Sequence, residues 1–232
     1  MTWRMWSPPP SDAELRIYRA SVRKSSFIGV YCSVFGDKAI ASPVVPTGFK
    51  MKLRDLLRAE AAITTVGSVS SVGMMIVMNS RGFVVPKTAN DDELAALEQH
   101  SKVLVVEDKM SALGNLIVAN DKGAVISDLI SEHAASQISD FLGVDHIRMS
   151  VGKYRTIGSL FAVSNEAGIA SPLVDEKTLA QVSSALQIKM VPTTVNDGER
   201  LVKLGVLLND RAIVVGMNTN GVELMSLQAL SR

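Results

Sequence analysis

A hairpin signature recurs five times along this chain, at a spacing of about forty-four residues. Three copies are plain and span residues 72–82, 113–123 and 157–168. A looser copy begins at Ile28, and a fifth ends at Arg211. Because one such unit cannot bury its apolar face alone, neighbouring copies must pack against one another. The repeat therefore constrains the fold before any single residue constrains the chemistry.

Composition excludes several classes of protein. With 232 residues, 47% of them apolar, the chain has enough material for one sizeable core. The formal net charge is only +1, so any contact with nucleic acid must be local rather than spread over a basic surface. A single cysteine, Cys32, rules out an intrachain disulfide or a cysteine-based zinc site and fits a reducing compartment. We expect a cytoplasmic protein, because no apolar run approaches the ~20 residues that cross a bilayer and no secretory signal is evident.

The second unit illustrates the local pattern. Residues 74–78 form an apolar run typical of a strand, and a turn at 79–82 follows. Residues 83–85 return as a second strand, which ends at Pro86. A helix is predicted from about residue 90, with Thr88 or Asn90 as its cap, and residues 103–106 form a last apolar strand. Each unit thus reads strand, turn, strand, helix, strand.

The fifth unit lacks its last strand, because the chain ends soon after the helix around Glu223–Leu227. An unassigned strand candidate, Leu15–Ala20, lies at the other end of the chain. Pairing the two closes a ring and leaves fewer exposed strand edges. We therefore predict an α/β fold: a five-bladed α/β propeller with five-fold pseudosymmetry, inner strands around an axis and helices on the rim. Residues 15–232 would form one domain, and residues 1–14, which contain three consecutive prolines, a flexible extension.

Several motifs in these units resemble the archaeal and eukaryotic translation initiation factor 6 family. The motifs are Lys109-Met110-Ser111-Ala112-Leu113-Gly114-Asn115 followed by Asn120-Asp121, Asn79-Ser80-Arg81-Gly82 with Asp92-Glu93-Leu94, Thr194-Val195-Asn196, Asn209-Asp210, and Thr219 with Glu223-Leu224. The resemblance runs from about Leu15 to the C-terminus. The chain departs from the pattern in its N-terminal extension and at Lys203, which stands where units two to four place Gly.

The resemblance implies a fold and a function. The fold of the family is the pentein ring, which agrees with the ring predicted from the repeats. Members of the family bind the large (50S) ribosomal subunit on its joining face and prevent association with the small subunit, in control of initiation or in ribosome biogenesis. The docking surface in the family involves a uL14-type ribosomal protein, near the sarcin–ricin loop of the rRNA. No cofactor, metal, small-molecule substrate or reaction is implied, and we expect a monomer.

The repeat indicates where a binding surface would lie. In each unit a residue after the Gly, or after Lys203 in unit five, is expected to point out at one end of the ring; these residues are Val30, Met74, Asn115, Ser159 and Leu204. Only Asn115 carries an amide, and by resemblance it corresponds to the contact residue for the ribosomal protein. The alternative is an Asn bonded to its own loop. Further candidates are Lys109, Ser111, Thr194, Asn196, Asn218 and Thr219, for which turn and cap chemistry is the alternative.

Other features have plainer interpretations. The helix 50–58 has a basic outer face that would contact rRNA phosphates, but a solvated face is the simpler interpretation, as it is for Arg19, Arg23 and Lys24. The pentein ring also hosts guanidine-modifying hydrolases, which use a Cys nucleophile with His and carboxylates. Cys32 would have to play that part; a small buried apolar role is favoured. Only 5% of residues are aromatic, which argues against a general RNA-binding module.

Overall fold

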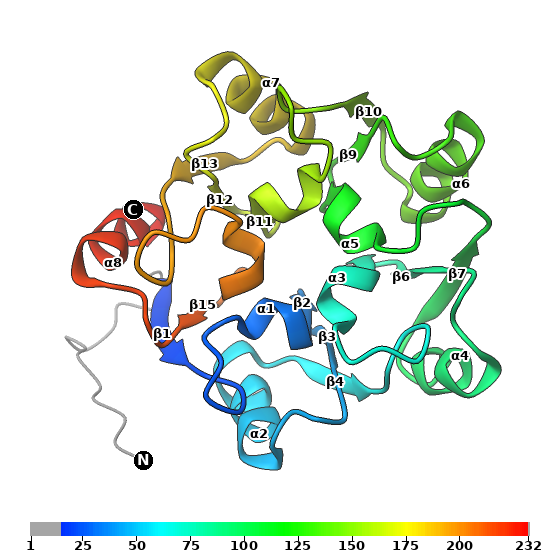
Figure 1. Ribbon diagram of the computed structural model, residues 1–232, viewed down its shortest axis with the longest axis horizontal. Helices are drawn as coiled ribbons and strands as arrows, with labels where there is room; N and C mark the ends of the chain where they lie inside the picture. Colours follow the sequence, from blue (N-terminus) through cyan, green and yellow to red (C-terminus); the bar gives the residue numbers. More distant parts are fainter. Residues whose placement is uncertain (1–14, 232) are drawn as a thin grey trace.

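The computed structural model describes residues 15–231 as a ring of five similar units around a central axis (Figure 1). Residues 1–14 and 232 lie outside the described residues, and so does the predicted N-terminal extension. Long helices form the rim of the ring, and short helices surround its centre (Figure 1). The predicted five-bladed α/β propeller is confirmed.

Each unit contributes one three-stranded sheet with an inner, a middle and an outer strand. The middle strand pairs antiparallel with the inner strand and parallel with the outer one. From unit one to unit four the strands are β2 (Cys32–Phe35), β3 (Lys38–Ala41) and β4 (Glu60–Ile63); β5 (Val77–Asn79), β6 (Gly82–Pro86) and β7 (Lys102–Val106); β8 (Ile117–Ala119), β9 (Ala124–Ser127) and β10 (His146–Met149); β11 (Phe161–Val163), β12 (Ala167–Ala170) and β13 (Lys189–Pro192). The outer strand predicted at 103–106 in the second unit is confirmed as β7, which begins one residue earlier.

The fifth sheet is completed by the first strand of the described chain. Unit five supplies β14 (Val206–Leu208) and β15 (Ala212–Gly216), and its outer strand is β1 (Arg16–Ala20). β1 runs parallel to β15, from the pair Arg16–Ala212 to the pair Ala20–Gly216. The predicted closure of the ring by the N-terminal strand is therefore confirmed. Closure removes the open edge that an unclosed array would expose.

The rim helices begin at side-chain caps in four of the five units. They are α2 (Thr47–Leu57), α4 (Asp91–Glu98), α6 (Glu132–Leu142), α7 (Glu176–Leu186) and α8 (Gly221–Gln228). Asn90 and Asn220 form capping boxes with the Glu three residues later, and Ser131 and Asp175 also cap their helices. Of the two caps predicted for the second unit, the structure selects Asn90. Such caps satisfy backbone N–H groups that the first helical turn leaves free.

Neighbouring units share their apolar cores. Each rim helix packs against the sheet of the preceding unit: α6 contacts β7, α7 contacts β9, and α2 contacts β15 across the closure. One apolar cluster, for example, joins Val84 of unit two to Ala134, Ala135 and Ile138 of unit three. No described unit buries its helix on its own, as the repeat argument requires.

The start of each inner strand differs from the prediction. Residues 74–78 were predicted as one strand, but Val72–Met75 is a one-turn helix, and β5 begins only at Val77. The other units have equivalent turns: α1 (Ile28–Tyr31), α5 (Leu113–Leu116), η1 (Ile157–Leu160) and η2 (Val202–Gly205). Helical spacing places Val72 and Ile76 on one face, and both are completely buried. An apolar run this short does not distinguish the two structures by its period.

The glycines of these short helices permit the units to meet at the axis. A Cβ on Gly73 would lie 2.0 Å from the carbonyl oxygen of Gly29, and one on Gly114 would lie 2.5 Å from that of Gly73. Gly158 meets Gly114 in the same way, again at 2.5 Å. Any side chain there would push neighbouring backbones apart. These glycines lie within the short helices, not directly before the strands.

Candidate functional site

The topology brings all the candidate residues to one end of the ring. A short helix precedes each inner strand and a hairpin turn follows it, so the two lie at opposite ends of that strand. We call the first the helix end; it comprises α1, α3 (Val72–Met75), α5, η1, η2 and the loops 21–27, 65–71, 107–112, 150–156 and 194–201 that lead into them. The second is the hairpin end, with turns at 36–37, 80–81, 121–122, 165–166 and 210–211. Lys109, Ser111, Met74, Ser159, Thr194, Asn196, Asn218 and Thr219 lie at the helix end with Asn115, on these elements or just before α8.

Asn115 differs from its counterparts in the other units. Its backbone N–H donates to the Ala112 carbonyl at 3.0 Å, which closes the turn of α5. Its side chain is half-buried, and its Oδ1 atom has no hydrogen-bond donor among the described residues. A shielded amide oxygen without a donor costs about 1–3 kcal/mol. The Oδ1 atom is therefore an unsatisfied hydrogen-bond acceptor at the helix end, within the described residues.

The equivalent residues offer less. The Ser159 side chain is buried, and its hydroxyl donates to the Thr156 carbonyl at 2.6 Å. Met74 is half-buried on α3, Ser111 is half-buried before α5, and Lys109 is exposed. Of this set, Lys109 presents exposed charge and Met74 partly exposed apolar surface at the helix end, whereas the Ser159 hydroxyl is already satisfied internally.

The polar residues of unit five serve an internal network. Thr194 donates through its hydroxyl to Glu223 Oε1 at 2.6 Å, and the backbone N–H groups of Asp197 and Gly198 donate to the same carboxylate. The backbone N–H of Asn196 donates to the Thr219 hydroxyl at 3.1 Å, and Thr219 is buried. Thr194, Asn196 and Thr219 therefore have the structural roles in turns and caps that were given above as the alternative to partner contacts. Asn218 is exposed in the turn that precedes the cap of α8.

Glu223 is a structural clamp at the helix end that the sequence did not lead us to predict. Burial alone would raise its carboxyl pKa, but hydrogen bonds from Thr194, Asn220, Gly198 and Asp197 outweigh burial and hold the pKa below its ordinary value. Glu93 repeats the arrangement in unit two, with donors at Thr65, Asn90, Ser68 and Gly67. A Thr at the end of an outer strand, with Asn-x-x-Glu at the start of the next rim helix, is the signal that identifies it.

Exposed apolar side chains add to the helix end, Phe27 and Val69 among them. Phe27 precedes α1 and Val69 lies in the turn before α3, and their exposed fractions are 40% and 39%. Both loops lead into short helices that pack against each other at the axis. The helix end thus carries exposed apolar side chains on units one and two and the polar Asn115 on unit three, a mixture typical of protein interfaces.

The hairpin end is occupied by contacts between units. Asn120 donates through Nδ2 to the carbonyls of Ser164 at 3.2 Å and Leu186 at 2.8 Å, the latter being the last residue of α7. Asn79 and Asn209 make the equivalent bonds to the next units. The turn loops are hairpins, as predicted. The Asn residues of the family-like motifs therefore join one unit to the next.

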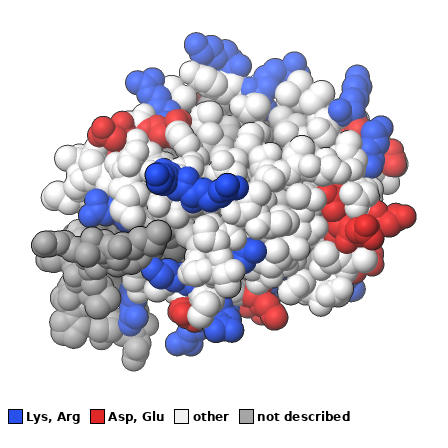
Figure 2. Space-filling view, turned by 60° about the horizontal axis from the view of Figure 1, so that its bottom comes forward, with Lys and Arg blue, Asp and Glu red and all other residues white. Residues whose placement is uncertain are grey.

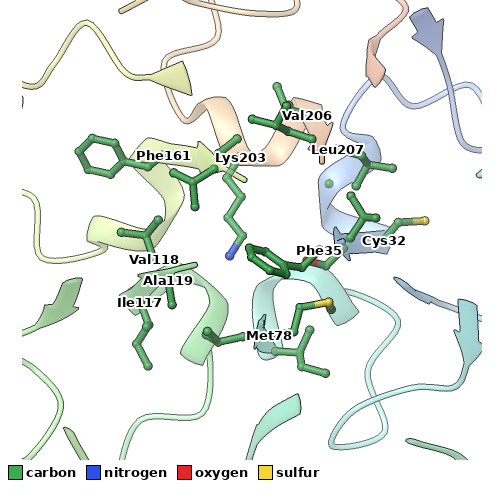
Figure 3. A pocket seen from close by; sticks show the side chains of 18 residues that line it. Cys32, Phe35, Met78, Ile117, Val118, Ala119, Phe161, Lys203, Val206 and Leu207 are labelled. Atoms are coloured by element: carbon green, nitrogen blue, oxygen red, sulfur yellow. The ribbon is translucent and has the colours of Figure 1, made fainter. Parts of the chain in front are cut away.

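The pore along the axis encloses a cavity of about 60 Å³ lined by the inner strands (Figure 3). Lys203 extends into it, and its amine donates to the Gly114 carbonyl at 2.5 Å (Figure 3). Burial lowers the pKa of this amine to about 8. Cys32 also lines the pore, and burial raises the pKa of its thiol to about 12. Among the described residues, those that line the pore include no histidine and no carboxylate.

Charged side chains are dispersed over the surface. On the face shown in Figure 2, Lys and Arg side chains are scattered over uncharged surface, and acidic groups form one larger cluster at the right and smaller ones elsewhere. The predicted basic face of α2 is interrupted, because exposed Arg54 lies 3.8 Å from the carboxylate of exposed Asp55, and Lys50 is half-buried. Within residues 15–231, no His, Cys, Asp and Glu side chains form a cluster suited to a metal ion. No helix in this part of the chain is long and apolar enough to span a membrane.

The closed ring of five ββαβ units defines a protein of the pentein fold. Residues 17–230 match the model of the eIF-6 family, and the chain belongs to that family. It is 43% identical over 217 residues to translation initiation factor 6 of Nitrosopumilus maritimus, covering 91% of this chain and 96% of the relative. The corresponding protein of Cenarchaeum symbiosum is 41% identical with the same coverage. Eukaryotic translation initiation factor 6 of Entamoeba dispar is 30% identical and covers 91% of both chains. These relatives support a role in translation initiation.

A solved structure of DDAH from Pseudomonas aeruginosa, complexed with citrulline, also resembles the chain, with a TM-score of 0.47 and 13% identity over 76% of this chain and 71% of that one. The activity of that enzyme does not follow for this chain at such an identity.

Proposed function

We propose that this protein binds the large ribosomal subunit through the helix end of its ring and thereby sterically blocks the joining of the small subunit. Membership of the eIF-6 family supports the part of the proposal that assigns the protein to translation initiation. We choose the helix end as the binding surface because the amide oxygen of Asn115 lacks a hydrogen-bond donor within the described residues. No covalent step is required, because a folded domain on the joining face occupies space that the small subunit needs.

The two ends of the ring differ in what they offer a partner. At the hairpin end, the side-chain amides of Asn79, Asn120 and Asn209 donate hydrogen bonds to backbone carbonyls of neighbouring units. At the helix end, Phe27 and Val69 expose apolar surface. We infer a docking patch formed by these two residues with Met74 and Asn115, and with Lys109 at its border. A uL14-type protein would provide the backbone groups for Asn115, with the sarcin–ricin loop of the rRNA nearby. The protein would act as a cytoplasmic monomer, in initiation control or in subunit maturation.

The alternative of a guanidine-modifying hydrolase finds less support. Such chemistry needs a thiolate with an acid or base within reach. The Cys32 side chain is 1% exposed, its thiol pKa is raised, and the pore lining offers no carboxylate or imidazole. A non-enzymatic binding role is the proposal that the geometry favours.

Co-sedimentation with purified large subunits tests the docking surface. Replacing Asn115 by Ala removes the amide and should weaken binding by about 1–3 kcal/mol if the residue lies near the centre of the interface. Arg211→Ala, an exposed change in a turn of the hairpin end, is the matched control and should bind like the wild type. Unchanged binding of the Asn115 variant, or an equal loss in the control, would remove the helix end from the proposal.

A further inference from the structure

Unit five breaks the glycine pattern of the short helices. The four other units place Gly29, Gly73, Gly114 and Gly158 where their backbones meet, and unit five places Lys203. Its side chain turns into the pore and its Nζ atom donates to the Gly114 carbonyl at 2.5 Å (Figure 3). Adjacent units meet through their short helices, but this bond joins unit five to unit three and passes over unit four. It is a chord across the ring.

We propose that Lys203 is a positioning residue for the helix end, which holds α5 in place and so sets the direction in which Asn115 is presented. Gly114 immediately precedes Asn115, and its carbonyl is the group that the lysine holds. This inference rests on the proposed function, in which Asn115 contacts the partner.

The packing around α5 explains how Lys203 can affect the orientation of the Asn115 side chain. The Gly114 carbonyl also lies against Gly158, where a Cβ would approach it to 2.5 Å and would lie 2.8 Å from the carbonyl carbon of Asn115. The segment is therefore held between the lysine and η1, with no spare room on the side of unit four. Releasing the lysine frees the carbonyl on one side only, which permits α5 to tilt toward the pore. Because α5 is a single turn, a tilt changes the direction of the Asn115 side chain directly.

The bond is charge-assisted, and the pore contains little to compete with it. Among the described residues that line the pore, the only other titratable group is the Cys32 thiol, whose pKa is raised by burial. The protonated amine accordingly has the Gly114 carbonyl as its hydrogen-bond acceptor rather than a carboxylate. Hydrogen bonds from a charged donor are roughly twice as strong as neutral ones. Loss of the proton in alkaline solution should therefore weaken the hold on α5 without changing the size of the side chain.

The contact itself is tested by NMR of the free protein. The carbonyl ¹³C shift of Gly114, read through the amide of Asn115, should titrate as the pH is raised from 7 to 10 in the wild type. In Lys203→Met, which keeps the length of the side chain and removes the donor, it should not titrate. The carbonyl of Gly73, the equivalent residue on α3, is the internal reference. A flat Gly114 shift in the wild type would overturn the proposal.

Its consequence is tested by binding to large subunits, with a double-mutant cycle. K203M should raise the Kd about three- to ten-fold, and K203M combined with Asn115→Ala should bind no worse than Asn115→Ala alone, because both changes act through one contact. Additive losses, or an unchanged Kd in K203M while the wild type binds, would overturn the positioning role. Absence of binding by the wild type would instead overturn the proposed function, and the carbonyl titration would still decide whether the lysine holds α5.

Discussion

Removal of the Asn120 side chain should open the seam between units three and four. Its Nδ2 atom donates to the carbonyls of Ser164 and Leu186, and its Oδ1 accepts from the backbone N–H groups of Lys122 and Gly123. Asn120 is completely buried, so water cannot replace these bonds without a rearrangement. Asn120→Ala leaves two buried carbonyls without their donor and loosens the hairpin turn.

The expected cost follows from those four bonds. A lost hydrogen bond costs about 1 kcal/mol, and a buried group left without a partner costs about 1–3 kcal/mol. A total of about 3–5 kcal/mol is a large part of the ~5–15 kcal/mol that stabilises a typical domain. Urea unfolding followed by circular dichroism should show a midpoint lowered by about 1–2 M with an unchanged slope.

The matched control is Asn218→Ala, an exposed Asn in a turn, which should change the free energy of unfolding by less than about 0.5 kcal/mol. If Asn120→Ala lost less than about 1 kcal/mol, the reasoning that these Asn residues clamp one unit to the next would be refuted.

Three further results are expected from the perturbed pKa values. Stability should fall as the pH drops through the lowered carboxyl pKa of Glu223, because the carboxylate binds its proton less readily in the folded state. Glu223→Gln should flatten this part of a plot of urea midpoint against pH. A parallel fall in both proteins would contradict the clamp. Conversely, stability should rise between about pH 8 and pH 10, because Lys203 binds its proton more weakly in the folded state. K203M should lose that rise in stability. If the variant kept it, groups other than Lys203 would be its cause. Finally, Cys32 should resist iodoacetamide at pH 8 in the native protein and react in urea, and rapid native labelling would revive the hydrolase alternative.

Local signals explain why the ring was predictable from the sequence. Turn residues such as Asn79–Gly82, caps such as Asn90 and the apolar spacing of the rim helices are each encoded within a few residues. The strand Arg16–Ala20 was not assigned to any unit, and only the fifth unit, which contains β15, lacked an outer strand. The one-turn helices were missed because four apolar residues, as in Val72–Met75, satisfy a strand and a helical turn equally well.

The site was less predictable, because its contacts join residues that are distant in the chain. Asn196 bonds to Ser26, 170 residues away, and Thr194 bonds to Glu223, 29 residues away. Repeat alignment identified Lys203 as a departure from the Gly pattern, but only the ring geometry shows that its amine reaches Gly114. Asn115 was singled out by its position in the repeat and by family resemblance. Its binding role stays a prediction.

Subunit joining on a sucrose gradient tests the central claim most directly. Purified archaeal large and small subunits are mixed under conditions that favour joining, with the wild-type protein or with Asn115→Ala at equal concentration. The account predicts that the wild type moves material from the joined peak to the separate subunits and co-migrates with the large one, while the variant needs several-fold more protein for the same effect. An undiminished joined peak at saturating wild-type protein would contradict it.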